Sequence, residues 1–486
     1  MVTRKTCHLS AASQPGVPMK CRSWILVTAL GFAWFGACTK RGKSTAPPVS
    51  SAATTASDER PPLDSGGQRG STSPTQPLDS ASTNDSAGAP ETGSPTEDPP
   101  RVLGDLEAVV LREGTTPGGE LGSKVAWVGD QVWVSEPGGG GIIHRLPDGP
   151  TFTAADPEAH LGVALSPYGA GVLAGAWSRE GHDDATGAVY LLTADSGNQM
   201  VERDLSPVVV LEDGVVGVVL LGEGAGAHPD GWLLGQPRFR GDRGRISLRS
   251  AIDHSLVAEW HGSDTGELAG GSMATPDLNG DGLRDLATGA WGQSTFAGRV
   301  YAVHAPFSES AVLSDADGAW TGERWTLAGY TLAAGDVTGD GLDDLVVGSF
   351  GDTRNGSGSG AFTVVPAGSS GGPLVALDAH RLGDGPDAHF SAGLALADID
   401  QDGFVDITAG APDGMAGGVA RVYYGPIEGV GTAWDAQLLD PASAPRDGLG
   451  GAMALHPDHG WVVGAPGASE RQGRVLFAET TLLQPE

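Results

Sequence analysis

Short apolar runs separated by clusters of Gly, Asp and Pro extend from about Leu103 to the C-terminus. This alternation is typical of many short strands joined by turns. No stretch of the sequence sustains the period of about 3.6 residues that an amphipathic helix shows. Residues 103–486 are therefore predicted to form an all-β domain.

The apolar runs of this domain belong to a repeated unit. Three segments that begin at Asp277, Asp336 and Asp398 align directly, and each is followed by a loop and a further apolar run. Four weaker copies share a pattern of two apolar residues, Gly or Ser, a small residue, and Pro or an aromatic residue. The seven Gly or Ser anchors of this pattern are Ser135, Gly175, Gly235, Gly289, Gly348, Gly410 and Gly464. Such repetition indicates an array of small sheets that bury one another.

Two of the copies contain a literal Gly-Ala-Pro, at residues 410–412 and 464–466, and Phe390 is the nearest remnant of a Phe-Gly element. The repeats thereby resemble the FG-GAP repeats of integrin α-subunits and of bacterial surface proteins. The resemblance covers roughly Leu106 to the C-terminus and implies a seven-bladed β-propeller. To close such a ring, we expect Leu106–Leu111 to supply the outer strand of the last blade, beside the segment GRVLFAE.

The three strong copies open with loops that suit calcium, which takes six to eight oxygen ligands. Each loop offers oxygens at positions one, three, five and nine, a turn glycine at position six, and a backbone carbonyl at position seven. The predicted ligands are Asp277, Asn279, Asp281, Leu283 and Asp285 in the first loop, Asp336, Thr338, Asp340, Leu342 and Asp344 in the second, and Asp398, Asp400, Asp402, Phe404 and Asp406 in the third.

An EF-hand is excluded, because position twelve is Thr288, Val347 or Ala409 inside an apolar run and not a bidentate Glu. The alternative to a metal site is a plain Asp-Gly turn that binds nothing. The other four copies lack the carboxylates, so about three calcium ions are predicted, with a mainly structural role. In propellers that resemble this one, such loops bind calcium on the lower face.

The N-terminal 102 residues of the chain have a different character. Lys20 and Arg22 precede an apolar stretch that ends at Cys38, so residues 1–38 are predicted to be an export signal, with translation starting at Met1 or Met19. The end of this stretch resembles the lipobox of bacterial lipoproteins, in which Cys38 is lipidated; an ordinary cleaved signal is the alternative. Residues 39–102 are rich in Ser, Thr, Pro and Ala and are predicted to be a disordered tether. The expected location is extracytoplasmic and membrane-anchored, at an outer membrane or cell surface.

The charge of the chain and its cysteine positions exclude one class of partner and one kind of covalent link. The formal net charge is −31, and Lys124 is the only lysine after Lys43, so nucleic acid is not expected as a partner. The three cysteines all lie in the first 38 residues, so the predicted propeller contains no disulfide.

The sequence contains no H-E-x-x-H or P-loop motif, and no catalytic residue is assigned. Aromatic and Arg residues in the loops after the second strand of each unit are candidate ligand contacts. They are Trp177, Arg179, Arg240, Trp291, Phe350 and Arg354. The alternative for the aromatic ones is that they pack the blade ends.

These observations favour a lipid-anchored binding or adhesion module that is stabilised by calcium and recognises a protein or glycan. An extracytoplasmic hydrolase or lyase acting on a polysaccharide or phosphoester is the alternative function, and a spacer without a ligand is a third. Membrane contact is expected through the lipid anchor alone.

Overall fold

The computed structural model describes residues 22–28, 31–37, 104–106, 108–156, 159–176, 187–193, 197–201, 204–210, 217–221, 231–307, 310–414 and 417–479. In the N-terminal part, β1 (Arg22–Thr28) and β2 (Gly31–Ala37) pair as a separate two-stranded sheet. These strands lie in the predicted export signal, which stays a prediction. Cys38 and the predicted tether lie outside the described residues.

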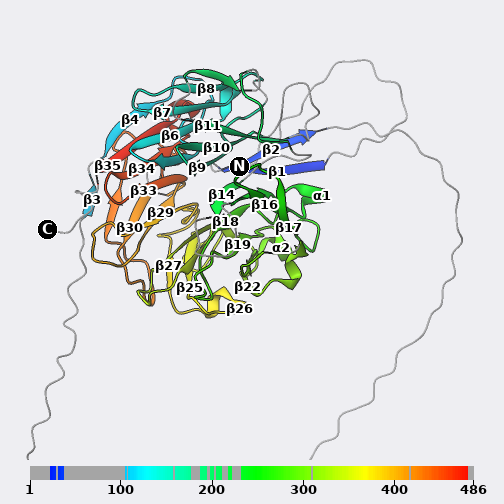
Figure 1. The fold of residues 1–486 in the computed structure, drawn as a ribbon. Coiled ribbons are helices and arrows are strands. Elements are labelled where there is room, and N and C mark those ends of the chain that lie inside the picture. The colour runs from blue at the N-terminus through cyan, green and yellow to red at the C-terminus, as the bar shows by residue number, and fades with distance from the viewer. Residues whose placement is uncertain are drawn as a thin grey trace, which may run out of the picture. The chain divides into compact units, whose positions relative to one another are not determined.

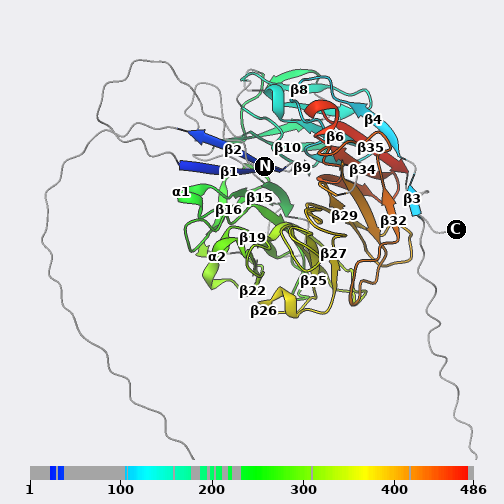
Figure 2. The same ribbon diagram turned by 180° about the vertical axis from the view of Figure 1, so that it is seen from behind.

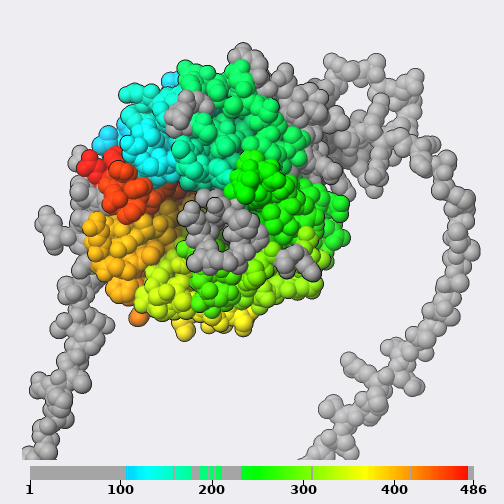
Figure 3. All heavy atoms as spheres, in the orientation of Figure 1, coloured from blue at the N-terminus to red at the C-terminus, as the bar shows by residue number. Residues whose placement is uncertain are grey.

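The described residues from 104 to 479 form a seven-bladed β-propeller, which confirms the predicted fold (Figures 1 and 2). Each blade is an antiparallel sheet whose four main strands follow one another from the centre outwards. The first strands of successive blades contact one another in turn, and the first strand of blade seven contacts that of blade one. Figure 3 shows the same succession on the surface, where the red C-terminal blade lies beside the cyan first blade.

The strands of the first three blades have the following bounds. Blade one contains β5 (Val125–Val128), β6 (Gln131–Glu136), β7 (Ile142–Leu146) and β8 (Thr151–Ala154); blade two contains β9 (Ala164–Tyr168), β10 (Gly171–Ala176), β11 (Ala188–Thr193) and β13 (Val209–Val210); blade three contains β14 (Gly217–Leu221), β15 (Gly231–Gln236), β16 (Arg245–Ser250) and β17 (Leu256–His261).

The last four blades are built in the same way. Blade four contains β18 (Ser272–Ala274), β19 (Leu286–Gly289), β20 (Arg299–Val303) and β22 (Gly318–Thr321); blade five contains β23 (Ala328–Gly335), β24 (Asp344–Ser349), β25 (Ala361–Val365) and β27 (His380–Leu382); blade six contains β28 (Gly393–Ala397), β29 (Asp406–Ala411), β30 (Val419–Tyr423) and β32 (Ala436–Leu438); blade seven contains β33 (Ala452–His456), β34 (Gly460–Ala465), β35 (Arg474–Glu479) and β4 (Val109–Glu113).

Five blades carry an additional short strand on their outer edge. In each case it comes from the segment just before the outer strand of the next blade and pairs in parallel. These strands are β12 (Gln199–Val201), β21 (Ala311–Val312), β26 (Gly371–Pro373), β31 (Val430–Gly431) and β3 (Gly104–Leu106). They cover edges that would otherwise expose unpaired backbone groups, and they tie each of these blades to its neighbour.

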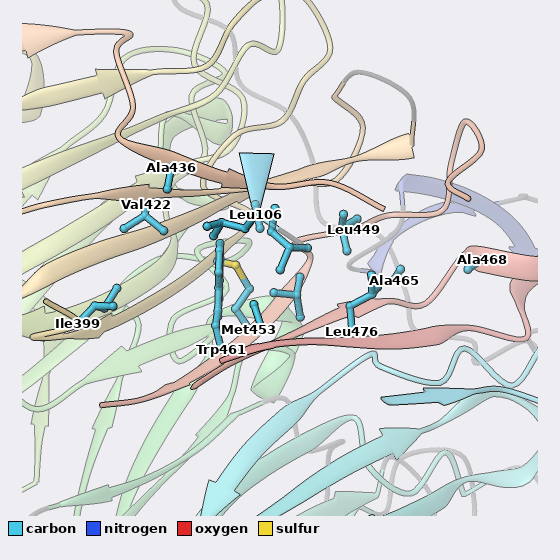
Figure 4. Close-up of a cluster of buried hydrophobic side chains, with 14 residues drawn as sticks. Leu106, Ile399, Val422, Ala436, Leu449, Met453, Trp461, Ala465, Ala468 and Leu476 are labelled. Atoms are coloured by element: carbon cyan, nitrogen blue, oxygen red, sulfur yellow. The ribbon is translucent and has the colours of Figure 1, made fainter. Parts of the chain in front are cut away.

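The ring closes through its N-terminal segment. β4 pairs with β35 in blade seven, and the Arg474 Nε lies 2.8 Å from the Glu113 carboxylate across this pair. The predicted closure is therefore confirmed, but the predicted boundary Leu106–Leu111 is wrong. Leu106 belongs to β3, which pairs with β32 of blade six, and its side chain packs near Met453 and Trp461 between the last two blades (Figure 4).

The anchor glycines mark the points where neighbouring blades touch. A Cβ added at Gly289 would lie 2.0 Å from the carbonyl oxygen of Gly329 in the next blade, and one at Gly464 would lie 2.0 Å from that of Gly122 in blade one. Real Cβ atoms do not approach so closely, so the repeat pattern keeps a small residue at these anchors. The blades enclose large apolar side chains, among which Trp133, Trp232, Trp260, Trp320 and Trp461 are fully buried.

The connections divide between two faces of the propeller. We define the lower face by the turns between the first and second strands of each blade, and the upper face by the loops between the second and third strands and between blades. Short helical turns are found in the described residues at α1 (Phe239–Asp242), α2 (Gln293–Phe296), α3 (Ala468–Arg471), η1 (Gly138–Gly140), η2 (Leu313–Asp315) and η3 (Leu374–Ala376). The turns α1, α2 and α3 all lie in upper-face loops and contain consecutive residues with positive φ.

Candidate metal centres and the opposite face

The first aspartate of each predicted calcium loop organises the loop backbone on the lower face. In the first loop, Oδ1 of Asp277 accepts hydrogen bonds from the N–H groups of Gly280 (2.9 Å) and Asp281 (3.1 Å), and Oδ2 accepts one from Gly282 (2.8 Å). Asp336 accepts the corresponding three bonds in the second loop, at 2.7, 3.0 and 2.9 Å. The first two loops therefore adopt the same turn at the same repeat positions.

The ninth residue of each loop is a fully buried aspartate at the start of, or just before, the second strand. Asp285, Asp344 and Asp406 are 0% exposed, and each accepts at least two backbone N–H hydrogen bonds of 2.7–3.1 Å. Burial raises the pKa of all three carboxyls above the ordinary range. For Asp406 burial, with the added charges of Asp400 and Asp402, raises the pKa to about 7. A bound cation would offset this cost of holding the carboxylates charged.

The third loop brings its carboxylates closest together. Asp398, Asp400 and Asp406 offer oxygens that all lie within 4.8 Å of one another, the one such group of three that the described part of the chain contains. Ligands of one calcium ion lie 2.3–2.6 Å from it, so such oxygens fit one coordination sphere. In addition, Oδ1 of Asp398 is buried without a hydrogen-bond partner, as is Oγ1 of Thr338 in the second loop. An all-oxygen donor set with unsatisfied buried oxygens fits a hard cation such as calcium.

The position-seven residues of the second and third loops pack on the loop that precedes each of them. Leu283, Leu342 and Phe404 donate their N–H groups to the position-five carboxylates of their own loops, at 2.8, 2.9 and 2.9 Å; their carbonyls stay predicted ligands. A Cβ added at Gly280 would lie 3.2 Å from Cδ2 of Leu342, and one at Gly339 would lie 2.3 Å from Cε1 of Phe404. The second loop thus packs on the first, and the third packs on the second.

Polar contacts reinforce this connection. The Asp343 carboxylate forms an ion pair with Arg284 and accepts a hydrogen bond from the Asp277 N–H at 3.3 Å. The Val405 N–H donates to the carbonyl of Asp336 at 3.2 Å. The three loops therefore form a continuous strip along the lower face of blades four to six.

The degenerate copies of blades one, two and seven form tight turns instead, whereas the copy of blade three falls largely outside the described residues. In blade two the strands join at Tyr168 and Gly171, and in blade seven at His456 and Gly460. The His456 ring lies 4.3 Å from that of His459, and its Nδ1 accepts the Asp458 N–H at 3.2 Å. These shorter turns have no room for the nine-residue ligand loop.

Four of the six candidate ligand contacts on the upper face lie in the described residues; Trp177 and Arg179 lie outside them. Arg240 is exposed, with a φ of 48°, and its guanidinium lies 4.9 Å from the Phe239 ring centroid. Arg354 is engaged within the protein, because its Nε lies 3.1 and 3.0 Å from the two carboxylate oxygens of Asp352.

The other two candidates belong to a row of neighbouring rings, stacked except for a 60° tilt between Trp291 and Tyr330, that crosses the upper face of blades four and five. We call this the aromatic row; its members in order are Trp325, Phe296, Trp291, Tyr330, Phe350 and His389. Successive ring centroids lie 5.6, 6.4, 6.1, 4.6 and 4.2 Å apart. Phe350 is only 3% exposed and packs between its neighbours, whereas Trp325 at the other end is 48% exposed. His389 Nδ1 lies 2.8 Å from an Asp413 carboxylate oxygen.

The aromatic row includes positions where the repeat turns with a positive φ. Phe296, Trp325 and His389 have φ values of 62°, 71° and 52°, in the left-handed region. The same region is adopted by the corresponding residues of other blades, Asp242, Arg446 and Leu268. Bulky side chains occupy this region at a cost of about 1–2 kcal/mol each. No periodic pattern of aromatic residues links the members of the row, so Phe296, Trp325, Tyr330 and His389 were not predicted as site residues.

Two stretches of the chain, residues 269–303 and 328–365, match the FG-GAP repeat family. They correspond to parts of blades four and five, where the first two predicted calcium loops lie. The chain is thus a seven-bladed β-propeller that carries FG-GAP repeats.

Similar proteins include integrin alpha-7 of Homo sapiens, which is 38% identical over 125 residues, covering 25% of this chain and 10% of the integrin. Integrin alpha-PS2 of Drosophila melanogaster is 34% identical over 165 residues, covering 32% of this chain and 11% of that protein. Phosphatidylinositol-glycan-specific phospholipase D of Mus musculus is 33% identical over 111 residues, covering 21% and 13% of the two chains. The chain thus matches about a tenth of the length of these relatives.

The comparison with integrin alpha chains is consistent with a binding module. Among the described residues, no helix combines the length and the hydrophobicity that a membrane span needs.

Proposed function

We propose that this protein is a calcium-stabilised, extracytoplasmic propeller that acts as a binding or adhesion module. The observation that carries the calcium assignment is the third loop, where three carboxylates converge and Oδ1 of Asp398 is buried without a partner. A calcium ion would supply positive charge at this point. The loop residues Asp398, Asp400, Asp402 and Asp406, with the Phe404 carbonyl, would hold it, and the first two loops would hold ions through their corresponding residues.

The proposed display on a surface rests on the N-terminal sequence. A signal ending at Cys38 and a tether over residues 39–102 would place the propeller away from the membrane, at an outer membrane or cell surface. Metabolic labelling with a fatty-acid probe tests this arrangement: the wild-type protein is expected to incorporate the label, and Cys38→Ser is expected to lose it. Equal labelling of both proteins would contradict lipidation at Cys38.

The proposed binding function is tested with labelled protein and cells from which its gene has been deleted. We expect saturable binding that a chelator removes and calcium restores. Binding that does not saturate, or no binding with calcium present, would contradict the proposal. The support for this function is the similarity to integrin alpha chains, and the partner class is a protein or a glycan.

A second candidate function is hydrolysis of a phosphoester or cleavage of a polysaccharide. Two observations favour it: the similarity to phosphatidylinositol-glycan-specific phospholipase D, and a histidine paired with a carboxylate, His389 and Asp413, on the upper face. A carboxylate can orient a histidine for general-base chemistry. Turnover of a phosphodiester or polysaccharide that His389→Gln abolishes would support the enzyme. Turnover by neither protein, together with saturable binding, would support the module.

A further inference from the structure

The exposed end of the aromatic row is a flat ring surface. Trp325 is 48% exposed, and its ring stacks on Phe296 with centroids 5.6 Å apart and an angle of 17° between the planes. The Trp291 ring continues the stack at 6.4 Å and 20° from Phe296. Three nearly parallel rings therefore support one another and fix the orientation of the exposed indole.

The folded state gains little from this arrangement. Phe296 and Trp325 both adopt left-handed backbone conformations, which glycine accepts without strain and bulky residues do not. A half-exposed indole also recovers only part of the free energy that full burial would provide. The left-handed turns recur at the corresponding positions of other blades, for example at Asp242 and Arg446, so they belong to the repeat. An exposed aromatic ring that its neighbours hold in place is typical of interface anchors, so Trp325 is a candidate contact.

Exposed polar residues stand beside Phe296 and Trp325 in the chain. Ser294 and Thr295 in the loop of Phe296 are exposed, as are Glu323 and Arg324 in the loop of Trp325. The Arg324 guanidinium lies over the Trp325 ring, 5.5 Å from its centroid. The site thus combines an exposed indole with a guanidinium, and the same two loops carry exposed hydroxyl and carboxylate groups.

From this combination we infer that Trp325, supported by Phe296 and Trp291, is a contact site for a neutral glycan. A pyranose ring presents C–H groups on one face and hydroxyl groups around its edge. The C–H face matches the electron-rich face of an indole, and the hydroxyl groups can accept hydrogen bonds from the Arg324 guanidinium beside it. The net charge of −31 disfavours an acidic polysaccharide, because like charges repel. This inference rests on the proposed binding function and specifies its partner class.

Titration calorimetry measures the binding of neutral glucan hexasaccharides to the protein in the presence of calcium. Three hexasaccharides are used, with β-1,4, β-1,3 and α-1,4 linkages. Trp325→Gly removes the ring and suits the left-handed backbone, so it is expected to fold. Loss of an aromatic anchor in an interface is expected to raise Kd by about 30-fold or more. Trp325→Phe keeps a ring and is expected to retain most of the affinity. Ile252→Ala, at an 86% exposed residue on the lower face, is the matched control and should bind as the wild type does.

Binding of one hexasaccharide that Trp325→Gly weakens and Ile252→Ala leaves unchanged supports the inference. Binding that Trp325→Gly leaves unchanged overturns it. If no hexasaccharide binds while the protein still binds cells saturably, the glycan site is overturned and the proposed binding function stands. If the cell binding is also absent, both fail. A dimer of the wild type that Trp325→Gly dissociates, without glucan binding, assigns the ring to a second copy and also overturns the glycan site.

Discussion

Replacing Gly464 by Ala tests the explanation of the repeat anchors at the point where the ring closes. The added Cβ would lie 2.0 Å from the carbonyl oxygen of Gly122 in blade one, against a practical minimum of 3.0 Å. A backbone carbonyl cannot move aside as a side chain can, so blades seven and one must separate locally. Overpacking of this kind costs about 1–3 kcal/mol, and the upper end applies here.

The corresponding shift in melting temperature follows from the size of the propeller. An unfolding entropy of about 2.1 cal/mol/K per residue gives about 0.8 kcal/mol/K for a domain of this length, so a loss of about 3 kcal/mol lowers Tm by about 4 °C. Differential scanning calorimetry of the two proteins in the same calcium buffer measures the shift.

Gly385→Ala is the matched control for this substitution. A Cβ at Gly385 would meet no atom within 4 Å, and its φ is not in the left-handed region. The control is expected to keep its Tm or to gain up to about 1 kcal/mol through the lower entropy of the unfolded chain. If Gly464→Ala melts within 1 °C of the wild type, the close approach of neighbouring blades does not explain the anchor glycines.

Three other predictions follow from the closure, the third loop and a buried histidine. Deletion through Gly114 removes β3 and β4 and is expected to abolish cooperative melting of the propeller, whereas deletion through residue 103 leaves Tm unchanged; equal melting of both would contradict the closure. Asp398→Asn is expected to remove about one of three calcium ions in a calorimetric titration and to reduce the calcium-dependent rise in Tm; an unchanged count would contradict the ligand assignment. Burial lowers the pKa of His380, so the unfolded chain takes up the proton first and stability falls as the pH drops through the ordinary histidine range. His380→Gln should therefore lose less Tm than the wild type between pH 7.5 and 5.5, and an equal loss would show that this histidine does not contribute.

The parts of the fold that repeat could be predicted from the sequence, because the physical constraint recurs in each blade. Gly289 and Gly464 stand at the same contact between blades. This anchor position occurs once in each blade, so the number of anchors in the sequence gives the number of blades. The aspartates of the predicted calcium loops are close in the chain, and their alternation with glycine follows from the turn they make. Local spacing is sufficient for both features.

Features that depend on contacts between blades could not be predicted in this way. The apolar run around Leu106 is predicted to be one strand from its sequence. In the structure it contributes to two strands, β3 in blade six and β4 in blade seven. The additional parallel strands contain two or three residues and have no pattern of their own. The aromatic row joins residues such as Phe296 and Trp325 from separate loops, and their stacking is set by the arrangement of the blades.

Calcium titration of the chelated protein, with a thermal melt at each end point, tests whether the three loops hold structural ions. About three bound ions and a clear rise in Tm are expected, because calcium that binds the folded state alone stabilises it. Magnesium at the same concentration is expected to give a smaller rise, since it requires a more regular six-ligand geometry. No calcium binding, or binding with no change in Tm, would contradict the claim that these loops are structural metal sites.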